Sequence, residues 1–276
     1  MKLVNYLSII ILLSLESSFA KMQIELVGTA KTPGCSGVIF AHPNYKAEQK
    51  ALFLTNSHCL KSDNKGQLYM SPEEVIWDLD FSNNLSVHLP KSGMFYGNLL
   101  KSLQTKKILF ASISGRDIAL IELEYTYKKL MEDLQIEPYL LSRSTGLKVG
   151  DQLDILGSYH EEIHKCTFDH FTENFIAAGP YLWTDALVLK NCLPKTRSGV
   201  SGAGVILAGT RNLIALHNSS NYSEKNECDT SNACEYDKLG INISRKYDAY
   251  SQNLDFLFSC FNENFEMDTK SCELAF

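Results

Sequence analysis

Short apolar runs separated by polar turns recur along most of this chain, and such runs predict β-strands. In one run, Val75, Trp77, Leu79 and Phe81 alternate with other residues, which predicts a half-buried strand that turns these four side chains inward. The pattern therefore predicts a chain dominated by strands, over residues 35–40, 51–59, 75–81, 107–113, 117–123, 152–156, 175–178, 186–192, 204–208 and 212–217.

Two stretches interrupt this rhythm. Residues 126–144, which include Pro138, predict a linker between two halves of the chain. Polar residues 218–238 predict a surface insertion that its own two cysteines close. After Ser244, a suitable N-cap, apolar residues recur at helical spacing and predict a helix within residues 244–276: Tyr247, Tyr250, Leu254, Leu257, Phe258 and Phe261.

The N-terminus has the three parts of a secretory signal peptide. Lys2 supplies a positive charge, an apolar run spans Leu7 to Leu15, and small residues lead up to Ala20. The run is too short to cross a bilayer, for which about 20 residues are needed. We expect residues 1–20 to be removed and the protein to be secreted or periplasmic, with an uncleaved anchor as the alternative.

The cysteine content and the net charge of the chain exclude several classes of binding partner. Eight cysteines in an exported chain favour disulfides, and the chain contains no Cys-x-x-Cys pair that would suggest a zinc finger or a redox motif. A formal net charge of −6 argues against nucleic acid or an anionic membrane as the main partner. We therefore expect no nucleic-acid partner and no stable membrane insertion.

A glycine-rich turn carries the candidate nucleophile. Ser201 lies within Gly199-Val-Ser-Gly202, where glycines let the backbone bend tightly and expose its N–H groups. A serine there can attack a carbonyl while the N–H groups of Gly199 and Ser201 stabilise the oxyanion that forms. Since most glycine-serine clusters are ordinary turns, the assignment depends on a histidine and an aspartate elsewhere.

Two residues at strand ends meet that need. His58 ends the strand at 51–59 beside a cysteine, and Asp117 begins the apolar run at 117–123. A surface histidine and a solvated turn aspartate are the alternatives.

A second motif points to different chemistry. His160-Glu-Glu-Ile-His164 matches the zinc-peptidase pattern, which requires a helix to bring both imidazoles to one face. Gly157 and the strand-like residues on either side predict a β-hairpin tip instead, so we expect no metal site here.

Taken together, the motifs resemble those of the trypsin-fold (chymotrypsin-like) serine peptidases, most closely the bacterial branch that includes the glutamyl endopeptidases. The resemblance rests on Cys35-Ser-Gly37, Leu54-Thr-Asn-Ser-His-Cys59, Asp117-Ile-Ala-Leu-Ile-Glu-Leu123 and Gly199-Val-Ser-Gly202, in the order His, Asp, Ser. It implies an all-β peptidase domain over residues 21–276, with two six-stranded antiparallel β-barrels at about 25–125 and 145–243, followed by the C-terminal helix. The active site would lie between the barrels and would act on protein or peptide substrates. We accordingly expect no cofactor, no metal and a monomer.

The resemblance also assigns roles. Ser201 would be the nucleophile, His58 its general base, and Asp117 the group that orients the imidazole. It further implies disulfides between Cys35 and Cys59 and between Cys166 and Cys192. Proximity in sequence alone suggests the other two pairs, Cys228 with Cys234 and Cys260 with Cys272.

Substrate preference rests on three residues of the implied S1 pocket. Lys195 stands where trypsin has the aspartate that selects Arg or Lys, so that preference is not supported. Thr196 and His217 match positions that bind acidic side chains in glutamyl endopeptidases, which suggests an acidic P1 residue. The alternative function is a catalytically inactive binding or adhesion module of the same fold that uses residues 218–238 as its contact surface.

Overall fold

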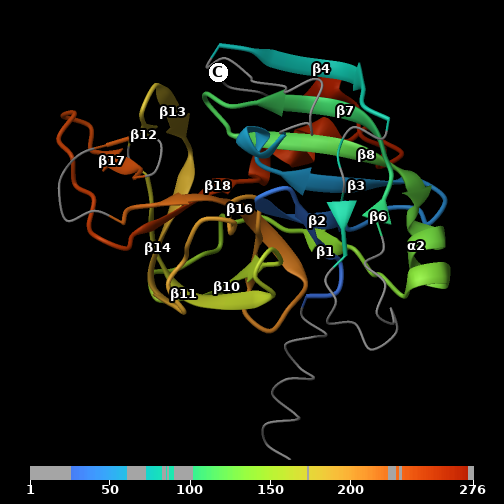
Figure 1. Ribbon diagram of the computed structural model, residues 1–276. Helices are drawn as coiled ribbons and strands as arrows, with labels where there is room; N and C mark the ends of the chain where they lie inside the picture. The colour runs from blue at the N-terminus through green and yellow to red at the C-terminus, as the bar shows by residue number, and fades with distance from the viewer. Residues whose placement is uncertain are drawn as a thin grey trace, which may run out of the picture.

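A computed structural model describes residues 26–60, 73–82, 85, 87–89, 102–172, 174–222, 228–229 and 232–272. The predicted signal peptide lies outside these residues. Figure 1 shows two halves side by side, with helix α2 at the outer edge of the first half.

The first half is a run of antiparallel strands in the order β1-β2-β3-β8-β7-β4. Two short strands extend it, because β5 pairs with both β1 and β6. Among the described residues no pairing joins β4 back to β1, so the first of the two predicted barrels is seen as an open path. The strands are β1 (Thr29–Thr32), β2 (Cys35–Ala41), β3 (Lys50–Thr55), β4 (Val75–Asp80), β5 (Val87–His88), β6 (Ser102–Leu103), β7 (Thr105–Ser112) and β8 (Ile118–Thr126).

The second half contains a closed barrel of six antiparallel strands. The path β10-β11-β14-β18-β16 is closed by β15, which pairs with both β10 and β16. Its strands are β10 (Gln152–Gly157), β11 (Glu162–Phe171), β14 (Ala186–Leu193), β15 (Gly204–Leu207), β16 (Asn212–Ser220) and β18 (Ala249–Asn253). A mostly β architecture with this barrel is consistent with the predicted two-barrel fold.

Smaller elements connect and decorate the halves. Helix α2 (Tyr127–Leu134) and strand β9 (Tyr139–Leu141) occupy the stretch expected to be a linker, and β9 pairs in parallel with β2 and β16. A separate sheet contains β12 (Phe175–Ala178), β13 (Tyr181–Thr184) and β17 (Cys234–Tyr236). Three 3-10 helices complete the described elements: η1 (Ser57–Cys59), η2 (Asp255–Cys260) and η3 (Thr269–Ser271).

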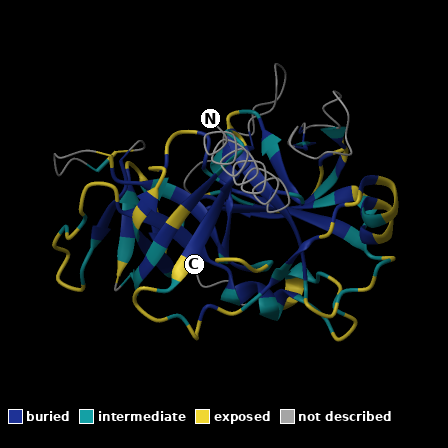
Figure 2. Ribbon diagram, turned by 90° about the horizontal axis from the view of Figure 1, so that it is seen from below, coloured by how far each residue is buried: buried dark blue, intermediate teal, exposed yellow. Residues whose placement is uncertain are grey.

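The hydrophobic core is divided into clusters that follow this layout, and Figure 2 shows buried segments running through both halves, with exposed residues concentrated in the outer loops. One cluster lies within the first half and includes α2, and another lies within the barrel of the second half. A third is shared: Val38, Phe40 and Leu54 of the first half pack with Leu156 and Leu213 of the second. This shared cluster fixes the two halves against each other at the place where their strand ends meet.

The predicted C-terminal helix was wrong over its first part. Residues Ala249–Asn253 form strand β18, all five residues are buried, and they pair with β14 and β16. Among the described residues of this stretch, only the short 3-10 helices η2 (Asp255–Cys260) and η3 (Thr269–Ser271) are helical. Ser251, Gln252 and Asn253 of this strand are polar although they are buried. The strand therefore shows neither an apolar run nor an alternation, and the apolar residues around it fitted the helical period instead.

The inward face predicted for residues 75–81 was also wrong in part. Strand β4 forms, but Trp77 and Leu79 are 42% and 39% exposed, while Ile76 is buried. In the described sheet β4 pairs only with β7, at the end of the path. An edge strand of this kind is open to solvent over part of its length, which leaves Trp77 resting on Phe110 with ring centroids 4.9 Å apart.

All four predicted disulfides are present. They join Cys35 to Cys59, Cys166 to Cys192, Cys228 to Cys234, and Cys260 to Cys272. Disulfides persist in oxidising compartments, so four of them fit an extracellular or periplasmic protein. Within the described ranges, no helix has the length and apolar character needed to span a bilayer.

Candidate active site

A histidine and a buried aspartate form the first part of the site. The carboxylate of Asp117 is fully buried, and its Oδ2 lies 2.5 Å from Nδ1 of His58. Its other oxygen, Oδ1, accepts a hydrogen bond from the main-chain N–H of His58 at 3.1 Å. The imidazole itself is 37% exposed. This two-point contact places the proton on Nδ1 and leaves Nε2 as the basic nitrogen.

The local sequence explains why these two residues meet. The apolar strands β3 and β8 pair side by side, so that the end of β3 lies beside the start of β8. After β3 the chain turns into η1, where Asn56 Nδ2 donates to the carbonyl of Asp117 at 2.7 Å. Ser57 Oγ donates to the carbonyl of Ile118 at 2.6 Å. These hydrogen bonds hold the His58 turn against the Asp117 turn.

Ser201 lies at a sharp bend in the second half. Gly202 follows it with φ +81°, and a Cβ there would lie 2.2 Å from the carbonyl oxygen of Ser36, so that only glycine fits. The carbonyl of Ser201 accepts a hydrogen bond from Ser36 N–H at 2.8 Å. The side-chain hydroxyl of Ser201 donates to the main-chain oxygen of Asn218 at 3.0 Å.

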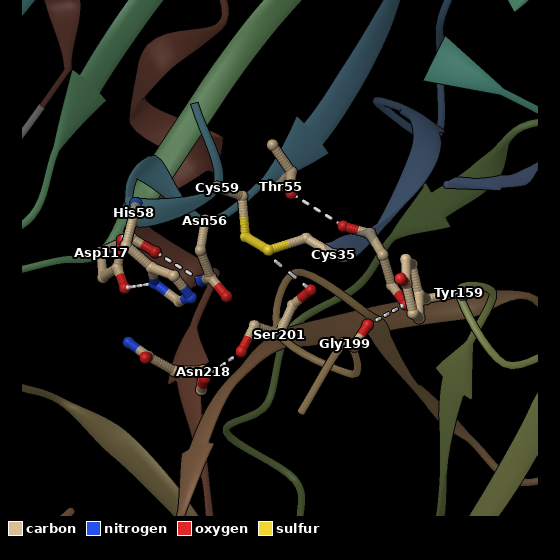
Figure 3. Close-up of a disulfide and its surroundings, with 11 residues drawn as sticks. Cys35, Thr55, Asn56, His58, Cys59, Asp117, Tyr159, Gly199, Ser201 and Asn218 are labelled. Carbon is tan, nitrogen blue, oxygen red and sulfur yellow. Dashed lines mark hydrogen bonds and ion pairs between the residues drawn. A yellow bond between two sulfur atoms is a disulfide. The ribbon is translucent and has the colours of Figure 1, made fainter. Parts of the chain in front are cut away.

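The Cys35–Cys59 disulfide brings the two parts together, as Figure 3 shows. A ring nitrogen of His58 lies within 4.8 Å of both sulfur atoms. On its other side, Sγ of Cys59 lies 4.0 Å from the carbonyl oxygen of Ser201. His58 and Ser201 are 143 positions apart in the sequence, and both therefore lie close to the same disulfide.

Two main-chain N–H groups beside Ser201 are available to a ligand. Among the described residues, neither the N–H of Gly199 nor that of Ser201 has a hydrogen-bond acceptor. Gly199 is buried and has φ +95°. Buried N–H groups are nearly always paired in folded proteins, so the unpaired N–H of Gly199, together with that of the half-buried Ser201, indicates a binding position for an anionic oxygen.

Of the three predicted S1 residues, two are buried and one is exposed. Thr196 is buried, and its Oγ1 lies 2.6 Å from Oγ of the fully buried Ser220. His217 is also buried, with Nδ1 3.5 Å from Oγ of Ser251. Lys195, in contrast, is exposed, and its ammonium lies 3.4 Å from the centre of the Tyr247 ring.

The free energy of unfolding is expected to depend on pH through His217. Burial lowers the pKa of His217 to about 3, helped by the nearby imidazoles of His164 and His58. In the unfolded chain a histidine titrates near 6.5, so only the unfolded state takes up this proton between the two values. The free energy of unfolding should therefore fall by about 1.4 kcal/mol per pH unit from this group as pH drops from 6.5 towards 3.

Urea unfolding of wild type and His217→Gln at pH 7, 6, 5 and 4 measures this contribution. The variant should lose stability less steeply with falling pH than wild type does. Equal slopes for the two proteins would show that His217 is not held neutral by its burial.

The residues of the zinc-peptidase motif lie on a hairpin and not on a helix. They lie at the tip of the β10–β11 hairpin and at the start of β11, as predicted, with no helix to align the histidines. His160 contacts a main-chain carbonyl of the Ser201 loop, whereas His164 is fully buried and contacts the carbonyl of Pro194. The one group of potential metal ligands among the described residues is Cys35, His58 and Cys59, in which the sulfurs are bonded to each other.

Sequence reasoning missed three residues that contact the site. Ser220 is the partner of Thr196, Asn218 supplies the carbonyl that holds the hydroxyl of Ser201, and Ser36 holds the loop around Ser201. Asn218 acts through its main-chain carbonyl, so its residue type gives no signal of this role. Ser36 lies within the Cys35-Ser-Gly37 segment, whereas Asn218 and Ser220 lie in the stretch that was predicted to be a surface insertion.

Comparison with known proteins gives structural neighbours but no sequence relatives. No model of a known protein family matches the chain, and no curated protein matches its sequence. The M. tuberculosis protease Rv3671c in its active form is 11% identical, with a TM-score of 0.48 over 83% of this chain and 76% of the other. The structural neighbours are trypsin-fold serine proteases.

Two further solved structures are similar to this chain to a comparable degree. A Nocardiopsis protease is 13% identical, with a TM-score of 0.44 over 83% of this chain and 93% of the other. A chymotrypsin of Cellulomonas bogoriensis is 12% identical, with a TM-score of 0.41 over 83% of this chain and 91% of the other. None of these likenesses distinguishes the glutamyl branch, which stays a prediction from the motifs.

Proposed function

We propose that this protein is an exported serine endopeptidase that hydrolyses peptide bonds through Ser201, His58 and Asp117. One observation carries the proposal: a fully buried carboxylate contacts both the imidazole and the main-chain N–H of His58, and the disulfide beside that imidazole also contacts the main chain of Ser201. A buried charge is costly unless it is paired, so this arrangement favours a functional pair over a structural one. Export would use the predicted signal peptide at residues 1–20.

The chemistry follows from these positions. Ser201 Oγ attacks the scissile carbonyl, and His58 Nε2 takes the hydroxyl proton and later gives it to the leaving amine. Asp117 keeps the other ring proton on Nδ1 and stabilises the imidazolium while it carries charge. The N–H groups of Gly199 and Ser201 stabilise the oxyanion, an effect of roughly 10²–10³ in rate for each donor.

The hydroxyl of Ser201 has to turn before it reacts. In the described conformation its proton is directed to the carbonyl oxygen of Asn218 at 3.0 Å. Transfer to His58 requires the hydroxyl proton to turn away from this oxygen about the Cβ–Oγ bond, with the loss of this one hydrogen bond. A single neutral hydrogen bond has a net value of about 1 kcal/mol, so the rotation is a small part of the barrier.

Labelling by a fluorophosphonate tests the proposal. The oxidised protein without residues 1–20 should be labelled covalently, Ser201→Ala should not, and EDTA should have no effect. Ser198→Ala is the matched control, because Ser198 lies in the same loop and its side chain is exposed. Absence of labelling on folded, disulfide-intact wild type would favour the binding module instead.

We also propose that S1 accepts an acidic P1 side chain. Thr196 and Ser220 share one hydrogen bond, so one of their two hydroxyl protons stays available to a carboxylate. The pKa of about 3 keeps His217 neutral at pH 7, so it offers at most a neutral N–H donor. Recognition would therefore rest on neutral hydrogen-bond donors.

A peptide panel that varies only at P1 measures this preference. Glu should give a higher kcat/KM than its neutral isostere Gln by about tenfold or more, and Thr196→Val should reduce that ratio. Equal or faster cleavage after Phe or Leu would show that S1 is an apolar pocket.

A further inference from the structure

The tip of the β10–β11 hairpin reaches across to the loop that carries Ser201. Nε2 of His160 lies 2.7 Å from the carbonyl oxygen of Ser198. Because a carbonyl oxygen only accepts, Nε2 carries the proton and donates it. This contact fixes the direction of the peptide bond between Ser198 and Gly199.

The next carbonyl of the same loop is held as well. The N–H of Tyr159 donates to Oγ of Ser36 at 3.0 Å, and that hydroxyl donates onward to the carbonyl of Gly199 at 2.9 Å. Figure 3 shows Tyr159 beside Gly199. Two neighbouring residues of the hairpin tip thus fasten the two carbonyls that flank the N–H of Gly199.

Peptide geometry links these contacts to the oxyanion position. A trans peptide is planar, and its C=O and N–H groups point in opposite directions. With the carbonyl of Ser198 bound to His160, the N–H of Gly199 points away from the hairpin tip, and no described residue accepts it. If this peptide rotated, the carbonyl would replace the N–H donor at the oxyanion position.

We infer that His160 is a positioning residue that holds the Gly199 N–H in the orientation needed to stabilise the oxyanion. The inference rests on the proposed function. It gives a role to the first histidine of the zinc-peptidase motif that needs no metal.

The hairpin tip is anchored well enough to serve as a support. Oγ of Ser158 donates to the carbonyl of Ala30, and Glu161 pairs with Lys31 at 2.6 Å, so the tip is tied to the first half. Glu162 pairs with Arg197 at 2.6 Å, which ties it to the loop of Ser201. Such partly exposed ion pairs add little stability, but together with the buried hydrogen bond they fix an orientation.

Packing leaves the Gly199 peptide close to this support. A Cβ at Gly199 would lie 2.5 Å from the ring of Tyr159 and 3.1 Å from Nε2 of His160. The absence of a side chain at Gly199 is therefore what allows the hairpin tip to reach the loop backbone. The hairpin tip and the Ser201 loop are in direct contact at Gly199, where the space between them holds main-chain atoms but no side chain.

The test compares wild type with His160→Ala and His160→Gln on one peptide substrate. His160→Ala should lower kcat about 10²-fold with KM nearly unchanged, because the lost donor acts on the transition state. Affinity for a peptide boronic acid should fall by a similar factor. His160→Gln, whose side-chain amide can still donate, should recover kcat to within about tenfold of wild type.

The outcomes separate this inference from the proposed function. If wild type cleaves the peptide and His160→Ala does so equally fast, the positioning role is overturned while the peptidase stands. If wild type shows no activity, the ¹³C resonance of the Ser198 carbonyl and the amide resonance of Gly199 still report the contact by NMR. Both should shift in His160→Ala and much less in His160→Gln, and unchanged resonances in His160→Ala would overturn the inference.

Discussion

Replacing His58 by alanine is expected to lower kcat by about 10⁶-fold, the cost of removing the base from a serine-histidine-aspartate unit. The imidazole contacts the buried carboxylate of Asp117 and lies beside the Cys35–Cys59 bridge, which also contacts the main chain of Ser201. Without it, the hydroxyl of Ser201 keeps its ordinary, weakly nucleophilic character. Peptide cleavage under saturating substrate measures the effect.

The folded state should survive this change, because the His58 side chain is 37% exposed and fills little of the core. Thermal unfolding of the variant provides the control. A fully folded His58→Ala protein that retained more than about a hundredth of wild-type kcat would remove His58 from the mechanism.

The conservative change Asp117→Asn is expected to lower kcat about 10⁴-fold. An asparagine keeps the size of the side chain but presents an N–H₂ group to one of its two contacts with His58. If that group faces Nδ1, the proton of the imidazole moves to Nε2, and the ring can no longer accept the proton of Ser201.

Asp169→Asn is the matched control for this substitution. Asp169 lies on β11, pairs with Lys190 and His170, and makes no contact with the proposed site. It should retain wild-type kcat. An Asp117→Asn enzyme as active as this control would mean that the carboxylate only supports the fold.

The elements that carry the proposed triad could be predicted because each lies at the end of a short apolar strand. His58 follows β3 and Asp117 precedes β8, so the change from apolar to polar residues marks both positions in the sequence. The Cys35–Cys59 bridge was implied by the family resemblance that these motifs carry. The strand ends themselves depend on residue type and order alone.

The features that could not be predicted depend on main-chain direction. The residue type of Asn218 does not indicate that its main-chain carbonyl accepts a hydrogen bond from Ser201. The residue type of His160 likewise does not indicate that its side chain binds a carbonyl of the Ser201 loop. Strand β18 escaped prediction for a different reason, since its five buried residues lack the alternation that identifies a strand.

The apolar cluster shared by the two halves has a consequence for engineering. It joins Val38 and Phe40 to Leu156 and Leu213, and each such side chain is worth about 1.5–3 kcal/mol when fully removed from water. A fragment cut near residue 134 would expose its share of this surface, would separate His58 and Asp117 from Ser201, and would tend to aggregate. Chimaeras that exchange one half for that of another protein of this fold would therefore need the cluster redesigned as a unit, because cooperative folding and the placement of one half against the other both depend on that one junction.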